Sequence, residues 1–597
     1  MSSSKVLSRG EIEHRIALGD AIVIFENSVL RMNKWLKFHP GGDKAVFHLV
    51  GRDATDEMIA YHCDETQATF KRWKIGEINY KWINFVPPIQ GGKFRTLEEQ
   101  ELDEIKEEQL SRSPASPASN SSSSEDLKLS SSTDPSDVED SIDTKAESSS
   151  NYAKQQQQKQ QQPKLNTTAG QCSEVTKPKI PQGLIPSLST KEAYERKVVK
   201  DPSDVIDNYD NGQVEQDLKS LPSLDYETQE HLSKEYNKLH DIIIENGWYQ
   251  CPYWEYAKEA TRIATLFSIS FTLLYFKWYF LSAIFLGLAW QQLVFIAHDA
   301  GHISITHQYE TDNIIGMIVA SFIGGLSLGW WKRNHNVHHL ITNDPVHDPD
   351  IQHLPFFAVS TRLFGNVYST YYEKFLWFDA FAKKLIPIQQ FMYYPILSFG
   401  RFNLYRLSWE HVLFGQGPRH GKAAWFRYFE LVGLTFFNWW FFYLIVYKSI
   451  ESNSSRFMFV MVSHITTMIV HVQITLSHFA MSTSDLGTSE SFVSRQIRTT
   501  MDVDCPGWFD FFHGGLQFQA IHHLFPRVPR HNFRKIQPLV IGFCDKVGLK
   551  YSIYGFVDGN EVVINKLSDI AKQAKIMRDC HKTMKKEAIE EGKYFEF

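Results

Sequence analysis

Apolar runs long enough to cross a lipid bilayer constrain this chain more than any other feature. Three runs supply the roughly 20 helical residues that a bilayer core requires; they lie at residues 278–297, 428–447 and 457–477. A fourth run, residues 263–276, is shorter, and it reaches that length only if its helix extends back through Ala260 with Arg262 snorkelling to the interface. We therefore predict an all-α membrane domain with four transmembrane helices in two hairpins.

Three histidine-rich clusters lie beside these runs. They are His298-Asp-Ala-Gly-His302, His335-Asn-Val-His338-His339 and Gln519-Ala-Ile-His522-His523. Residues three or four apart share one face of a helix, so each cluster directs its side chains toward one point. An even number of predicted crossings separates the clusters, which places all three in one compartment. The loops on that side are rich in Lys and Arg, and this bias predicts a cytosolic site with both termini in the cytosol.

The number of candidate ligands indicates more than one metal ion. The clusters supply seven His and one Gln, which exceeds what one zinc ion needs. Imidazole is a suitable ligand for iron, zinc and copper, so ligand type alone does not identify the metal. We predict two metal ions.

Composition divides the chain into four regions. Residues 1–90 have the mixed composition of a small globular domain, residues 222–549 form the membrane domain with its cytosolic histidine cap, and residues 550–597 form a charged cytosolic tail. Between them, residues 91–221 are polar, and 16 of the 40 residues from 111 to 150 are Ser, so we predict a disordered Ser/Gln-rich linker. The net charge of −6 gives no indication of nucleic-acid binding, and six scattered cysteines give none of a disulfide framework.

A haem-binding motif stands in the first region. Trp35-Leu-Lys-Phe-His39-Pro-Gly-Gly42 precedes His62 by a short span, and this resembles cytochrome b5. The resemblance implies a small α+β domain that binds one haem b through His39 and His62. Two axial histidines leave no open site on the haem iron, which suits electron transfer. An electron carrier in the same chain implies that the two metals change redox state, which excludes zinc and favours non-haem iron.

The chain as a whole resembles the front-end desaturases, in which a cytochrome b5 domain is fused to a membrane domain with HxxxH, HxxHH and QxxHH boxes. The similarity extends to Thr342-Asn343, to Asp348-Pro-Asp350 and to residues 512–517. It implies a catalytic iron site built from His298, His302, His335, His338, His339, His522 and His523, with Gln519 as the front-end signature. His464, His471 and His478 recur every seven residues, and the resemblance implies that His478, at the cytosolic end, is a further iron ligand.

Metal-bound imidazoles need an acceptor for their second N–H group, so we also expect partners around the boxes. The candidates are His307, His347, His353, His513, Asp299 and Asp350.

The resemblance implies O2-dependent desaturation of a lipid in the endoplasmic reticulum membrane. Electrons would pass from NADH through a separate NADH–cytochrome b5 reductase to the haem and then to the irons. The sequences of the first and third boxes, together with residues 348–355, are most similar to those of fungal sphingolipid Δ8-(E)-desaturases. This resemblance implies a ceramide-type sphingoid base as substrate and a 4,8-diene as product. A Δ5 or Δ6 acyl desaturase and a histidine-box lipid hydroxylase stay open as alternatives, as does the oligomeric state.

Overall fold

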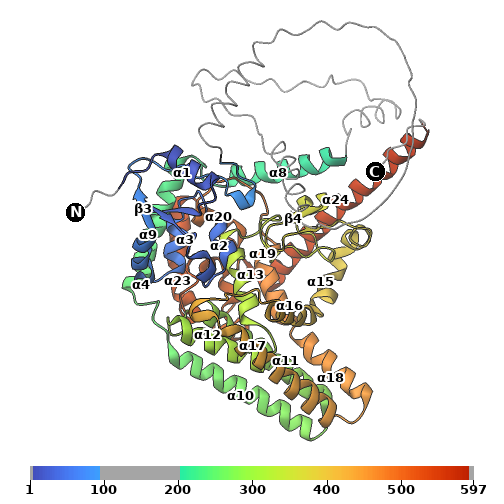
Figure 1. The fold of residues 1–597 in the computed structure, drawn as a ribbon. Helices are drawn as coiled ribbons and strands as arrows, with labels where there is room; N and C mark the ends of the chain where they lie inside the picture. The colour runs from blue at the N-terminus through green and yellow to red at the C-terminus, as the bar shows by residue number, and fades with distance from the viewer. Residues whose placement is uncertain (1–4, 95–201, 591–597) are drawn as a thin grey trace, which may run out of the picture.

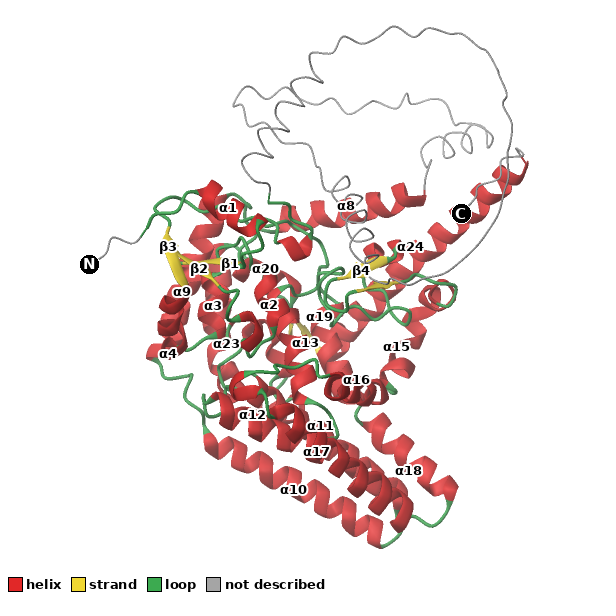
Figure 2. Ribbon diagram, in the orientation of Figure 1, coloured by secondary structure: helices red, strands yellow, loops and turns green. Residues whose placement is uncertain are grey.

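The computed structural model describes residues 5–94 and 202–590, and most of the predicted linker lies outside these residues. The described chain forms an N-terminal α+β domain that packs against a larger helical domain (Figure 1). Helices dominate the second domain, as Figure 2 shows. This arrangement confirms the predicted order of an α+β domain followed by a helical membrane-type domain.

The N-terminal domain is built on a three-stranded antiparallel sheet. Its strands, in the order β1-β2-β3, are Ile22–Phe25, Ser28–Arg31 and Lys74–Glu77. Its helices are α1 (Arg9–Ala17), α2 (Asp43–Phe47), α3 (Thr55–Tyr61) and α4 (Asp64–Gln67). A capping box fixes the start of α1, because Ser8 and Glu11 each bond the other's backbone N–H. Apolar side chains such as Leu7, Ile22 and Val29 fill the core between sheet and helices.

The lower part of the helical domain is a bundle of long helices (Figure 1). It contains α10 (Tyr253–Tyr275), α11 (Tyr279–Gly301), α17 (Phe426–Asn438) with its π-helical continuation Trp439–Ser449, α18 (Asn453–Thr466) and α19 (Met468–Phe479). A tight turn at Lys277, whose φ is +63°, reverses the chain between α10 and α11, so these two helices form an antiparallel hairpin. Trp290, Phe437 and Phe441 form part of the apolar core of the bundle.

Within the described residues, three helical stretches are long and apolar enough to cross a membrane: Tyr279–Gly301, Gly421–Ser449 and Asn453–Phe479. They coincide with three of the four predicted runs. A fourth span arises if the bent pair Tyr309–Ile323 and Leu328–Leu340, which turns by 118°, counts as one broken crossing. The fourth predicted run lies in α10, which is 23 residues long but is not among these spans. The chain therefore carries three or four apolar spans in its described part.

A second set of helices forms a cap on the bundle. They are α9 (Tyr226–Glu245), α12 (Tyr309–Met317), α13 (Leu328–Leu340), α16 (Gly400–Phe414), α20 (Phe492–Thr499), α22 (Gln519–Leu524) and α23 (Phe533–Val547). A shared apolar core that includes Leu232, Ile497 and Phe525 joins α9, α20, α22 and α23. The cap holds the histidine-rich helices in fixed positions.

The last helix of the described residues is the long α24 (Phe556–Glu590), which lies in the region predicted as a charged tail. Its buried face, with Val563, Leu567 and Ile570, packs against the helical domain. The prediction of disorder was wrong for the last part of the linker, because residues 202–220 form helix α8 (Pro202–Ser220). Ile206 and Tyr209 of α8 pack against the same apolar cluster as α24, a contact that polar composition does not reveal.

We expect Gly287→Ala to destabilise the membrane bundle. A β-carbon at Gly287 of α11 would lie 2.5 Å from the carbonyl oxygen of Ser463 in α18, so the two helices must separate. Overpacking of this kind costs about 1–3 kcal/mol. The exposed Gly542 of α23, whose β-carbon would meet nothing within 4 Å, is the matched control. Thermal unfolding in detergent should show a lower midpoint for Gly287→Ala than for Gly542→Ala, and equal midpoints would contradict the close packing.

Candidate metal centre

Helices α11 and α13 present the first two histidine boxes to each other. His298 lies in the last turn of α11, and His302 is the residue that caps this helix. Gly301 allows the close approach of α13, because a β-carbon there would lie 2.1 Å from Cζ3 of Trp331. At the start of α13, Glu430 accepts hydrogen bonds from Gly329 N and Ser327 Oγ, each at 3.0 Å. A carboxylate at a helix N-terminus stabilises the helix, so Glu430 fixes the helix that carries the HxxHH box.

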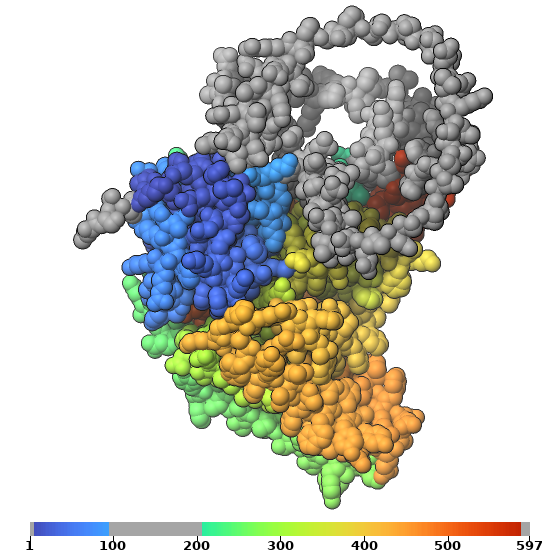
Figure 3. All heavy atoms as spheres, in the orientation of Figure 1, coloured from blue at the N-terminus to red at the C-terminus, as the bar shows by residue number. Residues whose placement is uncertain are grey.

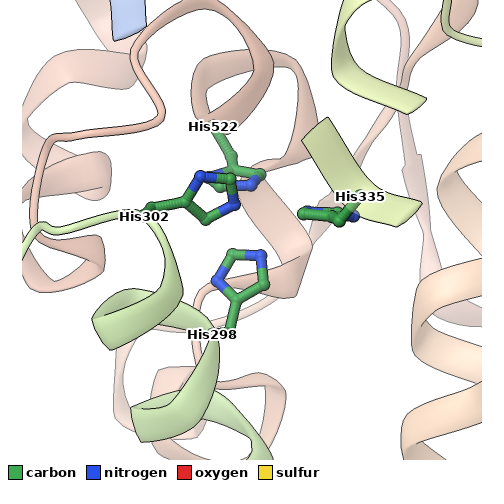
Figure 4. A group of neighbouring side chains, drawn as sticks. All are labelled: His298, His302, His335 and His522. Atoms are coloured by element: carbon green, nitrogen blue, oxygen red, sulfur yellow. The ribbon is translucent and has the colours of Figure 1, made fainter. Parts of the chain in front are cut away.

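The first group of convergent side chains comprises His298, His302, His335 and His522 (Figure 4). One ring nitrogen from each lies within 4.8 Å of the others, so the four could hold one metal ion. These histidines come from three helices and from all three sequence boxes. The structure thus brings together residues separated by up to 224 positions in the chain (522 minus 298).

The second group comprises His338, His478 and His523, whose ring nitrogens also lie within 4.8 Å of one another. His339 lies between the two groups, with its Nε2 2.9 Å from Nε2 of His335 and its ring stacked on that of His523 at a centroid distance of 4.1 Å. An overlapping group pairs His335 and His338 with Asp350. All eight predicted histidines therefore meet in one buried region.

Unpartnered ring nitrogens indicate that these histidines suit metal ions. Buried ring nitrogens without a hydrogen-bond partner occur in His302, His339, His478, His522 and His523. A buried polar atom without a partner costs about 1–3 kcal/mol, and a bound metal removes that cost. Burial also holds the pKa of both His522 and His523 well below the ordinary value for histidine, with neighbouring histidines adding to the effect. Neutral imidazole is the form that binds metals.

Carboxylates hold the outer nitrogens of the boxes. Asp348 accepts a hydrogen bond from Nδ1 of His338 at 2.8 Å, which leaves Nε2 for a metal. Asp350 lies 3.5 Å from Nδ1 of His335, and Asp299 lies 3.6 Å from Nδ1 of His298. Asp299 and Asp350 thus lie close to ring nitrogens of box histidines, and their role as acceptors for metal-bound imidazoles stays a prediction.

The predicted histidine partners bond elsewhere. His307 bonds the carbonyl of Tyr249, His347 bonds Thr370, His353 packs near Phe357 and Phe479, and His513 bonds Gln473. None of the described hydrogen bonds of these four histidines joins a box histidine.

Sequence reasoning missed two residues that position the boxes, Gln496 and Arg530. Gln496 of α20 bonds Nδ1 of His523 at 2.9 Å through its side-chain oxygen and donates to the carbonyl of His339. Arg530 forms buried ion pairs with Asp299 and Glu259 and so holds the carboxylate beside His298. No local motif marks these residues, because each acts across more than 25 positions of the chain.

The structure also shows the positions of Gln519, His464 and His471. Gln519 is buried as the first residue of α22, one turn before His522, and its neighbour Ala520 donates its N–H to Asp502 at 2.9 Å. His464 bonds Tyr405 and Val460 within the bundle, away from the two groups. His471 lies against Gly400.

The two histidines of the N-terminal domain face each other. Nδ1 of His39 bonds the carbonyl of Gly42 at 2.8 Å and Nδ1 of His62 bonds that of Met58 at 2.9 Å, which directs both Nε2 atoms to other partners. The ring centroids are 6.3 Å apart. A metal–imidazole bond is about 2 Å long, so this separation suits one iron between the two rings. The residues present therefore fit haem.

Comparison with known proteins finds a matching family for each of the two domains. Residues 9–79 match the cytochrome b5-like haem/steroid-binding domain, and residues 276–555 match the fatty acid desaturase family. A Kluyveromyces lactis protein named Delta 8-(E)-sphingolipid desaturase is 63% identical over 98% of this chain and 96% of its own length. A Candida albicans protein of the same name is 57% identical over 97% of this chain and 98% of its own length. A Borago officinalis acyl-lipid (9-3)-desaturase is 34% identical over 69% of this chain and 90% of its own length.

Fold and site together define a membrane oxidoreductase with a haem domain and a histidine-rich metal centre in one chain. The relatives, similar over nearly their full length, narrow this class: the chain belongs to the fatty acid desaturases that carry a fused cytochrome b5 domain. The predicted family and the predicted fusion are confirmed.

We expect Asp348→Asn to weaken metal binding at the second histidine group. The amide no longer fixes the proton on Nδ1 of His338, and the loss of such a partner typically lowers metal affinity by about 10- to 100-fold. Iron per chain, measured after dialysis against a chelator, should fall. Asp312, an equally buried carboxylate that bonds backbone N–H groups and no histidine, is the control, and Asp312→Asn should retain its iron. Equal iron in both variants would show that Asp348 does not orient His338.

Proposed function

We propose that this protein is an O2-dependent desaturase that forms a C=C bond at the Δ8 position of the long-chain base of a sphingolipid, giving a 4,8-diene. The observation that carries this proposal is the convergence of eight histidines beside a haem-binding domain: four in the first group, three in the second, and His339 between the two groups. The sphingolipid substrate is supported by full-length relatives in two yeasts that are named for this reaction.

In this proposal, the two histidine groups hold two iron ions and His39 and His62 hold one haem b. The iron ligands are His298, His302, His335, His338, His339, His478, His522 and His523, and Gln519 lies beside them. Bound iron supplies the oxidising power that removal of hydrogen from an unactivated alkyl chain requires. The chain's own residues position that chemistry: Asp348 and Gln496 set the ring orientations, and Arg530 holds Asp299 in place.

Electrons enter, in the same proposal, from NADH through a separate cytochrome b5 reductase and the fused haem domain. The protein lies in the endoplasmic reticulum membrane with four spans in two hairpins, and its metal centre and both termini face the cytosol. The antiparallel pair α10 and α11 and the three apolar spans support this topology, as do the basic loops on the side of the boxes.

An acyl desaturase is the second candidate, favoured by the similarity to the Borago officinalis acyl-lipid (9-3)-desaturase over 69% of the chain. This chain is 34% identical to that acyl-lipid desaturase but 63% identical to the Kluyveromyces lactis sphingolipid desaturase, so we favour the sphingolipid reaction. A lipid hydroxylase of the histidine-box class is the third. Gln519 in the last box favours desaturation over hydroxylation.

Lipid analysis tests the proposed reaction. Expression in a yeast that lacks Δ8-unsaturated long-chain bases should produce a 4,8-diene, detected by mass spectrometry of the released bases. His335→Ala should abolish the diene and lower non-haem iron, because His335 belongs to the first histidine group, whereas the exposed His231 can be replaced by Ala without effect. A new acyl double bond with unchanged long-chain bases would support the second candidate, and a hydroxylated base the third.

Replacement of an axial histidine tests electron supply within the chain. His39→Ala should abolish haem binding and desaturation even where free cytochrome b5 is abundant, because the fused domain is the donor. Non-haem iron should stay unchanged, since His39 lies in the other domain. The exposed His14 of α1 is the control, and His14→Ala should keep full activity. Full activity of His39→Ala would contradict supply within the chain.

A further inference from the structure

The haem-binding face of the N-terminal domain is docked on the helical domain. Figure 3 shows this domain in blue, packed directly against the rest of the chain. Asp56 of α3 accepts hydrogen bonds from Ser233 at 2.5 Å and Asn237 at 3.1 Å, both on α9. On the other side, the buried Lys44 of α2 donates to the carbonyl of Thr370 and to Glu373, each at 2.8 Å. Polar contacts therefore hold both edges of the docked face.

Between these contacts, the two haem-binding segments lie against α13, the helix of the HxxHH box. A β-carbon at Gly41, two residues after His39, would lie 2.9 Å from Nδ2 of Asn336. Tyr61, which directly precedes His62, contacts His339 edge to face, with ring centroids 6.0 Å apart and planes at 84°. Asn336 and His339 are three residues apart and share one face of α13.

Tyr61 is the side chain of the haem domain that contacts a candidate iron ligand through its ring. It packs against the apolar core of the cap, which also includes its neighbour Ala60. Its hydroxyl group is buried and has no hydrogen-bond partner. Tyr61 therefore contacts His339 through its ring and not through its hydroxyl group.

His339 is the histidine best placed to serve both metal positions. Its Nε2 lies 2.9 Å from that of His335 in the first group, and its ring stacks on His523 of the second group. A contact to His339 from outside thus reaches the whole centre through one side chain. By contrast, Asn336, which lies at the other haem-binding segment, is not one of the candidate iron ligands.

We propose that Tyr61 couples the haem to the non-haem iron centre, as the contact through which electrons pass from His62 to His339. This proposal rests on the proposed function. In each passage one electron crosses the Tyr61–His339 contact, the haem iron goes from ferrous to ferric and one non-haem iron goes from ferric to ferrous. No bond forms or breaks and no proton moves in this step. The reductase restores the ferrous haem with electrons from NADH, and two passages supply the two electrons for one double bond.

The rate of haem reoxidation tests this role directly. The purified protein is loaded with haem and ferric non-haem iron, its haem is photoreduced without O2, and the return of the ferric haem spectrum is followed. Tyr61→Leu should slow this return several-fold, because Leu removes the aromatic contact to His339. Tyr61→Phe should keep the parent rate, because the hydroxyl group has no partner. An unchanged rate in Tyr61→Leu would overturn the proposal.

Two controls separate coupling from structure. Tyr80, whose hydroxyl is likewise buried without a partner, packs beside Trp82 within the haem domain, and Tyr80→Leu should keep the parent rate. Docking is measured by crosslinking Asn84→Cys to Thr488→Cys, positions that bond across the interface. Tyr61→Leu should retain the haem spectrum and the crosslink yield. A slow rate that is accompanied by loss of the crosslink would assign Tyr61 to docking and would also overturn the proposal.

A chemical bypass supplies the last readout. A small reductant that reduces the non-haem iron directly should restore product formation by Tyr61→Leu to the parent level in a single turnover, and failure to restore it would overturn the proposal. The parent protein distinguishes this proposal from the proposed function. If its ferrous haem is not reoxidised by the centre at all, supply within the chain fails, whatever the role of Tyr61.

Discussion

The burial of eight imidazoles around one point is the constraint on which the rest of the structure depends. Five of these side chains carry ring nitrogens that no protein group satisfies. Each such atom costs about 1–3 kcal/mol when it is left alone, so the arrangement is favourable only around metal ions. The surrounding structure makes the site rigid. The apolar core that joins α9, α20, α22 and α23 provides that rigidity, and so does the carboxylate of Glu430 at the start of α13.

Much of the site could be predicted because its information is local. Spacings of three and four residues place His335, His338 and His339 on adjoining faces of one helix, and the structure contains that helix. His478 was predicted from the resemblance to the desaturases, and it lies at the end of an apolar helix within reach of His338 and His523. The turn at His39 is equally local, since Gly42, with a φ of +87°, shapes the chain where the His39 ring bonds the backbone.

Other parts could not be predicted, because they depend on contacts between distant segments. Gln496 and Arg530 belong to no motif, and only the packing of α20 and the segment after α22 brings them to the boxes. The polar composition of residues 202–220 predicts a disordered linker, but these residues form helix α8. The few apolar residues of α8 that contact the cluster around α24 do not change that composition. The fourth predicted span lies in α10, which has the length of a crossing but is not among the spans that pass by length and hydropathy.

The docked haem domain has a consequence for how the enzyme competes for electrons in a crowded membrane. Tyr61 lies against α13, and Lys44 and Asp56 hold its domain there through contacts to residues 370–373 and to α9. A free electron carrier therefore cannot approach the metal centre by this route without displacing the chain's own domain. Donor and acceptor are joined covalently, and their encounter is set by the geometry of one molecule rather than by the abundance of a second protein. Under the proposed function, electron transfer to the metal centre would then not depend on the concentration of a free carrier, although the reductase would still have to reduce the fused haem.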